Sequence, residues 1–240
     1  MGFGAVKKIK LQSADFEWVT SAPRYPLGVG EDYAEAEGFV LAGGRSSRMG
    51  RDKALLQLGG RSLLDIALDK LRALPLPAPP RVAGARSRAD AIADLHPGCG
   101  PLSGIEAALA ASTRPLNVFL PVDMPLLPAK FLGWMLRRAQ ITRAMVTVPR
   151  INGDPQPLCA VYHRQLLGPI TASLLAGNYK VMQAVCSAAT EPIDIFDVEL
   201  VASADPEMFA FSPVPAYRWF HNCNTPEDMA GIENALVLTP

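Results

Sequence analysis

The stretch that decides the fold is G-F-V-L-A-G-G, at residues 38–44. Its first part, Gly38–Ala42, is a short apolar run, which is typical of a buried β-strand. Gly43 and Gly44 end this run, because consecutive glycines favour a turn over a continued strand. Apolar residues then recur at helical spacing at Leu64, Ala67, Leu68 and Leu71. The segment therefore predicts a strand, a glycine turn and a helix in succession.

The same alternation of strands and helices is predicted over most of the remaining chain. Further strands are expected at residues 81–83, 116–121, 144–148, 157–162, 193–198 and 217–220. Further helices are expected at residues 86–93, 103–112, 127–139, 165–176, 180–189 and 225–236. Ser62 with Asp65, and Ser103 with Glu106, resemble N-terminal capping pairs of two of these helices. The pattern predicts an α/β fold, with a mostly parallel sheet and helices on both faces.

Composition excludes several classes of protein. The 240 residues carry 23 Lys and Arg and 23 Asp and Glu, so the formal net charge is zero. This argues against a nonspecific nucleic-acid binder, which needs a basic surface. Hydrophobic residues make up 49%, which is typical of a core-forming chain, and no run is long enough to span a membrane. The four cysteines form no C-x-x-C pair, which favours free thiols in a reducing cytoplasm. Residues 1–37 are expected to be a poorly ordered N-terminal extension, and residues 38–240 one domain.

The turn after the first strand is rich in cations. Arg45, Arg48, Arg51 and Lys53 place four positive charges within nine residues. A phosphate chain would neutralise them, and the glycines would let the backbone approach it closely. The alternative is an exposed basic loop that binds nothing specific. The turn matches neither a P-loop nor the G-x-G-x-x-G dinucleotide motif.

An aspartate follows the central predicted strand. Asp123 comes directly after Leu116–Pro121, where a carboxylate is costly unless it is paired or binds a cation. Opposite a phosphate loop it could hold Mg²⁺, which prefers one or two carboxylates together with phosphate oxygens. The alternative is an N-cap or loop aspartate before the helix near Leu127.

Three other segments are weaker candidates. The loop 94–104 could contact a nucleotide through backbone N–H groups, or could be ordinary turn structure. Pro157–Tyr162 could line an acceptor pocket, although these residues alone favour a plain buried strand. In residues 221–228, Thr225 fits a helix N-cap, and the side-chain oxygens of Asn222 and Asn224 could serve a metal.

These segments together resemble the molybdenum cofactor guanylyltransferase family, within the wider nucleotidyltransferase group. L-A-G-G-R-S-S-R-M-G-R-D-K at residues 41–53 is the most specific part of the resemblance, which runs from about Gly38 to Ile232. The segments G-P-L-S-G-I (100–105), V-D-M-P (122–125), P-L-C-A-V-Y (157–162) and N-C-N-T-P-E-D (222–228) complete it. The order and spacing of all five segments carry more weight than any one of them.

The resemblance implies a Rossmann-like three-layer fold and an enzyme that joins GTP and molybdopterin cofactor, giving the guanine dinucleotide cofactor and pyrophosphate. It implies nucleotide contacts by Leu41, Ala42, Gly43, Gly44, Lys53, Asp94 and Asp123. It further implies that Lys53 contacts phosphate and that Asp123 holds Mg²⁺, with help from Asn222 or Asn224. For the transfer step we expect Lys53, Arg48 and Asp123 to be the catalytic residues, because two cations and a bound metal would neutralise the charge that develops on the phosphates. The segment 81–86 lacks an asparagine that relatives often carry there, which leaves the choice of base open.

Other functions remain open at this point. The nearest is a cytidylyltransferase of the same cofactor, or a nucleotidyltransferase acting on another phosphomonoester. A non-enzymatic alternative is a nucleotide-binding or cofactor-carrier protein, against which the presence of Lys53 and Asp123 argues. No nucleic-acid or membrane partner is expected, a cytoplasmic location is expected, and the oligomeric state is left open.

Overall fold

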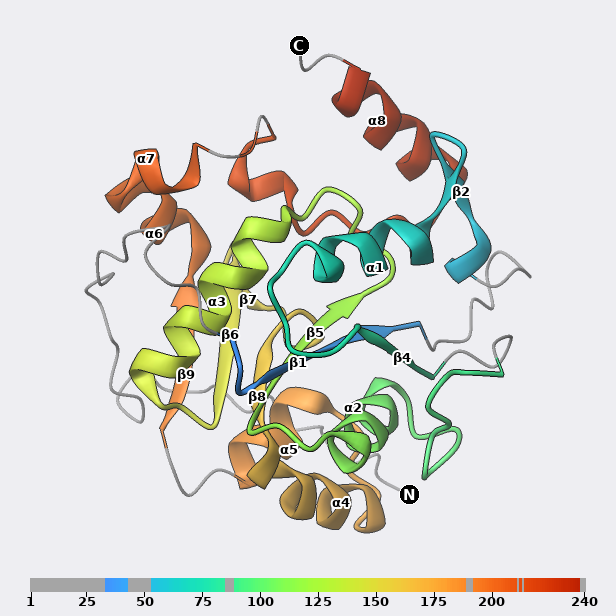
Figure 1. Cartoon of the computed structure of the whole chain (residues 1–240), viewed down its shortest axis with the longest axis vertical. Coiled ribbons are helices and arrows are strands. Elements are labelled where there is room, and N and C mark those ends of the chain that lie inside the picture. The colour runs from blue at the N-terminus through green and yellow to red at the C-terminus, as the bar shows by residue number, and fades with distance from the viewer. Residues whose placement is uncertain are drawn as a thin grey trace, which may run out of the picture.

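A computed structural model describes residues 33–42, 53–84, 89–188, 192–210, 212 and 214–237. These residues form a seven-stranded sheet in the order β4-β1-β5-β8-β6-β7, with β9 paired to β6 (Figure 1). The strands are β1 (Ala36–Leu41), β4 (Arg81–Ala83), β5 (Leu116–Pro121), β6 (Val146–Ile151), β7 (Asp154–Pro155), β8 (Val161–His163) and β9 (Ile193–Asp197). A separate antiparallel hairpin pairs β2 (Gln57–Leu58) with β3 (Arg61–Ser62).

The sheet is mixed, with a parallel core. Strand β1 runs parallel to both β4 and β5, and β9 runs parallel to β6. Strand β8 is antiparallel to both β5 and β6, so β5 and β6 point the same way, and β7 is antiparallel to β6. The predicted α/β fold with a mostly parallel sheet is therefore confirmed.

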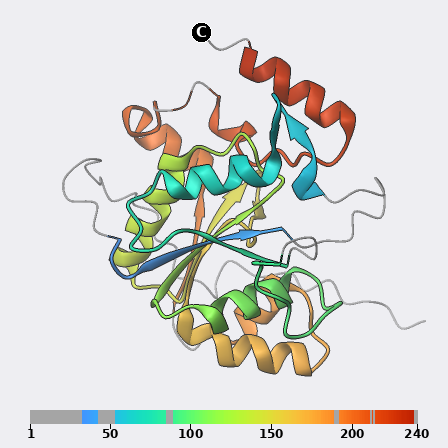
Figure 2. The ribbon, with the colours of Figure 1, turned by 45° about the vertical axis from the view of Figure 1, so that its right-hand side comes forward.

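Helices cover both faces of the sheet (Figures 1 and 2). One face carries α1 (Leu63–Arg72), α3 (Ala129–Thr142), α6 (Val198–Ala204), α7 (Pro206–Phe209) and α8 (Pro226–Val237). The other carries α2 (Pro101–Ala111), α4 (Leu167–Leu175) and α5 (Val181–Ala188). Short 3-10 turns lie at η1 (Lys53–Leu55), η2 (Arg164–Leu166) and η3 (Ala216–Arg218). None of the helices within the described ranges is long and apolar enough to cross a membrane.

The two faces of the sheet bury separate apolar cores. Along β1, Val40 packs into the core under α1 and α3, while Phe39 packs into the core under α2 and α4. Along β5, Leu120 and Phe119 divide in the same way, as expected for side chains that alternate across a strand. Tyr33 is also buried, so the core includes a residue that precedes Gly38, the expected start of the domain.

Two predicted helix caps are present. Asp65 N donates to Ser62 Oγ at 3.0 Å, so Ser62 caps α1. Asp228 N donates to Thr225 Oγ1 at 3.1 Å, and Thr225 N donates back to Asp228 Oδ2 at 2.8 Å. This reciprocal pair satisfies donors at the start of α8 that would otherwise lack partners.

The predicted Ser103–Glu106 cap is wrong. Helix α2 begins earlier, at Pro101, because proline suits the first helical position and needs no N–H partner there. Both residues are therefore inside the helix and fully buried. Ser103 Oγ accepts from His96 N at 3.2 Å, which uses the hydroxyl to hold the preceding loop.

Three other predicted elements also differ from the structure. The expected strand at 217–220 is the 3-10 turn η3 followed by a turn. The expected helix at 86–93 lies partly outside the described residues, and within its described part Ile92 forms a parallel bridge with Ala83. The expected strand at 157–162 begins only at Val161, since residues 157–160 form turns.

Candidate active site

The parallel strands of the core end side by side. Leu41, the last residue of β1, is in register with Ala83 of β4 and Pro121 of β5. The pairing continues one residue further, since Ala42 N donates to Ala83 O at 3.0 Å and Val122 N donates to Leu41 O at 3.1 Å. Segments that follow these strands therefore start from one edge of the sheet, where ligands of such folds bind.

Lys53 and Asp123 meet at this edge. Lys53 Nζ donates to Asp123 Oδ2 at 3.1 Å, and their side chains are 28% and 20% exposed. The same ammonium also donates to Asn224 Oδ1. Asp123 does not cap a helix, since α3 begins at Ala129 with Pro128 at its N-cap position, so the N-cap alternative is wrong, although Asp123 does lie in the loop between β5 and α3. Three polar side chains far apart in the chain thus converge on one point.

Backbone contacts hold this cluster in place. Cys223 N donates to Asp123 O at 2.8 Å, which ties the segment before α8 to the end of β5. Asn224 N donates to Asp228 Oδ2 at 2.8 Å. Backbone hydrogen bonding from Asn224 is the main cause that lowers the pKa of Asp228 from its usual value. The acidic side chain at the start of α8 is therefore engaged in orienting Asn224.

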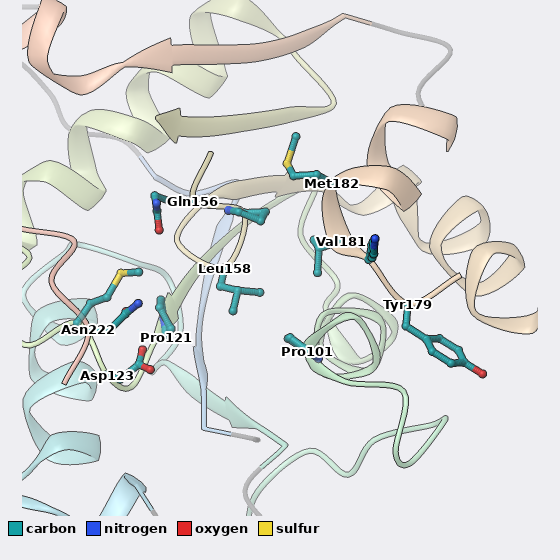
Figure 3. Close-up of a pocket in the computed structure, with 12 residues that line it drawn as sticks. Pro101, Pro121, Asp123, Gln156, Leu158, Tyr179, Val181, Met182 and Asn222 are labelled. Carbon is teal, nitrogen blue, oxygen red and sulfur yellow. The ribbon is translucent and has the colours of Figure 1, made fainter. Parts of the chain in front are cut away.

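A cavity of about 450 Å³ opens beside Asp123. Figure 3 shows Asp123, Asn222 and Pro121 at one end of it and Tyr179 at the other. Its wall between them includes Gln156, Pro157, Leu158 and Met182. Pro157 and Leu158 thus line a pocket, as one prediction for that segment stated.

The remainder of the predicted pocket segment faces the protein interior. Cys159 and Tyr162 are fully buried, as the alternative reading of a buried strand predicted. Burial raises the pKa of the Cys159 thiol to about 12, so this thiol stays protonated near neutral pH. Neither side chain is therefore offered to a ligand in the cavity.

Asp94 lies at another part of the same edge. A side-chain carbon at Gly104 would lie 3.5 Å from Leu41 Cδ2 and 3.8 Å from Asp94 Oδ1, so these three residues are neighbours. The loop that carries Asp94 is held by buried Glu106, which is 2.7 Å from His96 Nδ1. The structure brings Asp94 next to Leu41 but records no contact between Asp94 and Lys53.

The side-chain oxygens of Asp123 and Asn224 suit a cation that phosphate oxygens would also coordinate. The described ranges contain no group of three His, Cys, Asp or Glu residues that could cage a metal. Asp123 and Asn224 do, however, direct one oxygen each at the Lys53 ammonium, so a positive charge already fits between them. One carboxylate and an amide oxygen leave positions for phosphate oxygens, which is how proteins usually bind Mg²⁺.

Some predicted residues cannot be placed, and some lining residues were not predicted. Gly43, Gly44 and Arg48 lie outside the described residues. Gln156, Tyr179 and Lys180 line the cavity without having been singled out from the sequence. Their only sequence signal is position: Gln156 follows β7, and the other two precede α5.

The chain is similar in sequence to known proteins. Residues 38–191 match the family model of the MobA-like NTP transferase domain. The molybdenum cofactor guanylyltransferase of Xanthomonas euvesicatoria is 48% identical over 107 residues, which are 43% of this chain and 54% of that protein, so the match spans about half of that relative. The probable molybdenum cofactor guanylyltransferase of Pelotomaculum thermopropionicum is 31% identical, over 81% of this chain and 90% of that protein.

A solved structure shows the same fold. Molybdopterin-guanine dinucleotide biosynthesis protein A from Archaeoglobus fulgidus superposes with a TM-score of 0.66 and 24% identity, covering 84% of this chain and 98% of that chain. Fold, edge site and family match together define a nucleotidyltransferase. More narrowly, the chain belongs to the MobA-like family of molybdenum cofactor guanylyltransferases. The resemblance, fold class and enzyme class predicted from the sequence are confirmed.

Proposed function

We propose that this chain transfers GMP from GTP to the terminal phosphate of molybdopterin cofactor, giving the guanine dinucleotide cofactor and pyrophosphate. The observation that carries the proposal is the convergence of Lys53, Asp123 and Asn224 at the carboxyl end of β5, next to a cavity of about 450 Å³. The family relationship supports the choice of GTP and molybdopterin cofactor over other substrates.

The reaction needs charge neutralisation more than proton transfer. A phosphate oxygen of the acceptor attacks the α-phosphorus of GTP, a new P–O bond forms, and the bond to the β-phosphate breaks as pyrophosphate leaves with its electron pair. The attacking oxygen is already anionic, so no strong general base is required. Positioning and electrostatic stabilisation supply most of the rate in such transfers.

Lys53 supplies the positive charge at this point. On nucleotide binding, its ammonium exchanges Asp123 for phosphate oxygens and stabilises charge that develops during bond breaking. Arg48 would add a second cation from the glycine-rich turn. Leu41 and Ala42, together with Gly43 and Gly44, would let the backbone approach the nucleotide, and Asp94 would lie on its base or sugar side.

Asp123 would hold Mg²⁺, with Asn222 or Asn224 as a further oxygen ligand. When bound, the metal supplies Lewis-acid stabilisation to phosphate oxygens. Asp123 itself presents its carboxylate at the cavity, and its backbone is fixed by Cys223 N.

The acceptor would occupy the remainder of the cavity. Tyr179 stands at the end away from Asp123, where a flat ring system could be received (Figure 3). Lys180, the next residue, also lines the cavity and could receive an anionic group. Two features stay predictions: a cytoplasmic location, and an N-terminal extension followed by one nucleotidyltransferase domain, whose core includes Tyr33 and β1 from Ala36 and so begins before Gly38.

A pyrophosphate-release assay with GTP, CTP and ATP, each with and without molybdopterin cofactor, tests the proposal. Release with GTP that depends on the cofactor is the expected result. Preference for CTP would make the chain a cytidylyltransferase. Nucleotide binding with no release under any condition would instead favour a binding or carrier protein.

A further inference from the structure

A lysine lies beneath the segment that carries Asp123. Lys70 belongs to α1, three residues after Ala67 and seven after Leu63, so it shares their inward-facing side of the helix. Lys70 Nζ donates to Met124 O at 3.1 Å and also to Pro125 O. Burial lowers the pKa of this ammonium to about 7, which reflects a charged end drawn away from water.

The carbonyl groups that Lys70 contacts have few other donors available. They lie between the end of β5 at Pro121 and the start of α3 at Ala129, so neither strand nor helix satisfies them. Met124 O accepts one further hydrogen bond, from Leu127 N at 3.4 Å, which is long for such a bond. Because an unpaired buried carbonyl is costly, the ammonium fixes the path of this segment.

The same segment is held from its other side. Cys223 N donates to Asp123 O at 2.8 Å, immediately before the two carbonyl groups that Lys70 binds. Three consecutive carbonyl groups, at residues 123–125, thus each have a fixed donor from a distant part of the chain. This arrangement leaves the Asp123 carboxylate directed at the cavity.

Lys70 also interacts with a second segment beside the cavity. Its charge lowers the pKa of the buried Cys159 thiol, against the larger rise that burial causes. Cys159 directly follows Pro157 and Leu158, which line the cavity, whereas Lys70 itself does not line it.

We propose that Lys70 is a positioning residue for nucleotidyl transfer: through the carbonyl groups of Met124 and Pro125 it sets the place of Asp123. The inference rests on the proposed function, in which Asp123 binds the metal and nucleotide. Lys70 does not touch the substrates and acts only through the backbone.

The test compares Lys70→Met, which keeps the apolar stem of lysine and removes the donors, with the parent. Lys70→Gln, which keeps an amide donor but does not reach as far as the ammonium, is the second variant. Arg72→Met is the matched control, because Arg72 is exposed on the same helix. Among the residues that the structure describes, its ion-pair partner is the equally exposed Asp69. Two experiments are made: steady-state kinetics give kcat and KM for GTP, and electron paramagnetic resonance gives the Mn²⁺ affinity in the presence of a non-hydrolysable GTP analogue.

Lys70→Met should lower kcat by about 10- to 100-fold and leave KM for GTP within about threefold, since a small misplacement of a reacting group costs rate more than binding. Mn²⁺ affinity should fall by roughly 10-fold or more, as for other groups that orient metal ligands. Lys70→Gln should lose about threefold or more on both readouts, but less than Lys70→Met, because one shorter amide cannot replace the ammonium at both carbonyl groups. Arg72→Met should lose nothing.

A Lys70→Met protein with kcat and Mn²⁺ affinity within twofold of the parent would overturn the proposal, even if its melting temperature falls. If Lys70→Met does not fold, unchanged values for Lys70→Gln would overturn it equally. A parent that releases no pyrophosphate but binds Mn²⁺ with the analogue would refute the proposed function alone, and the Mn²⁺ comparison would still decide the role of Lys70. A parent that binds neither would refute both.

Discussion

Replacing Lys53 by methionine separates catalysis from stability. The substitution keeps the apolar stem of the side chain and removes the ammonium that contacts Asp123 Oδ2 at 3.1 Å and Asn224 Oδ1. The two partners of the ion pair are 28% and 20% exposed, and partly hydrated pairs of this kind contribute about 0–1 kcal/mol to folding. The free energy of unfolding should therefore change by no more than about 1 kcal/mol.

The effect on rate should be much larger. Loss of one preorganised donor from a transition state costs about 2.7–4 kcal/mol, which corresponds to roughly 10²- to 10³-fold in kcat. Pyrophosphate release measures the rate, and urea unfolding measures stability. Lys130→Met, at an exposed position near the start of α3, is the control and should match the parent in both. A Lys53→Met enzyme with kcat within twofold of the parent would remove Lys53 from the mechanism.

Three other substitutions test separate parts of the account. Asp123→Ala should abolish turnover in Mg²⁺ buffer while the far-ultraviolet circular dichroism spectrum is retained, and a near-normal rate would contradict its assignment. Arg138→Met should destabilise the fold by about 3–5 kcal/mol in urea, because it leaves Asp194, now bonded at 2.7 and 2.8 Å, buried without its partner. The pKa of Lys70 is lowered from its usual 10.5 to about 7 in the folded protein. Between pH 7 and 10.5, the unfolded chain therefore holds a proton on Lys70 that the folded chain has lost, so the free energy of unfolding rises with pH over this range. Between pH 7.5 and 9, the stability of the parent relative to Lys70→Met should increase by about 1–2 kcal/mol in urea unfolding, and a constant difference would refute the shift.

Elements with strong local signals were predictable from the sequence. The strand at residues 116–121 was predicted with its observed bounds, because a short and mostly apolar run flanked by turn residues is typical of a buried strand. The caps at Ser62 and Thr225 were also predictable. In each, a hydroxyl stands three residues before an aspartate and accepts a hydrogen bond from the backbone N–H of that aspartate, which would otherwise lack a partner at the helix start. The same pattern failed at Ser103, where Pro101 started the helix earlier and tertiary contacts used the polar groups.

The residues of the site also fall into those that the sequence identified and those that it did not. Lys53 and Asp123 were identifiable, since each follows a strand that ends at one edge of the sheet. Asn224 could not be separated from Asn222 by sequence alone, because only the folded turn before α8 decides which amide reaches Lys53. Lys70 gave no signal, since a lysine near the end of an amphipathic helix is most often solvated, and its partners are carbonyl groups 54 and 55 residues away.

A crystal structure of the protein with Mn²⁺ and a non-hydrolysable GTP analogue would test the central claim most directly. The account predicts an anomalous manganese peak at the Asp123 carboxylate, the triphosphate beside it, and Lys53 Nζ within hydrogen-bond distance of a phosphate oxygen. A nucleotide bound away from this edge of the sheet, with Lys53 still paired to Asp123 and no metal between the carboxylate and the phosphates, would contradict it.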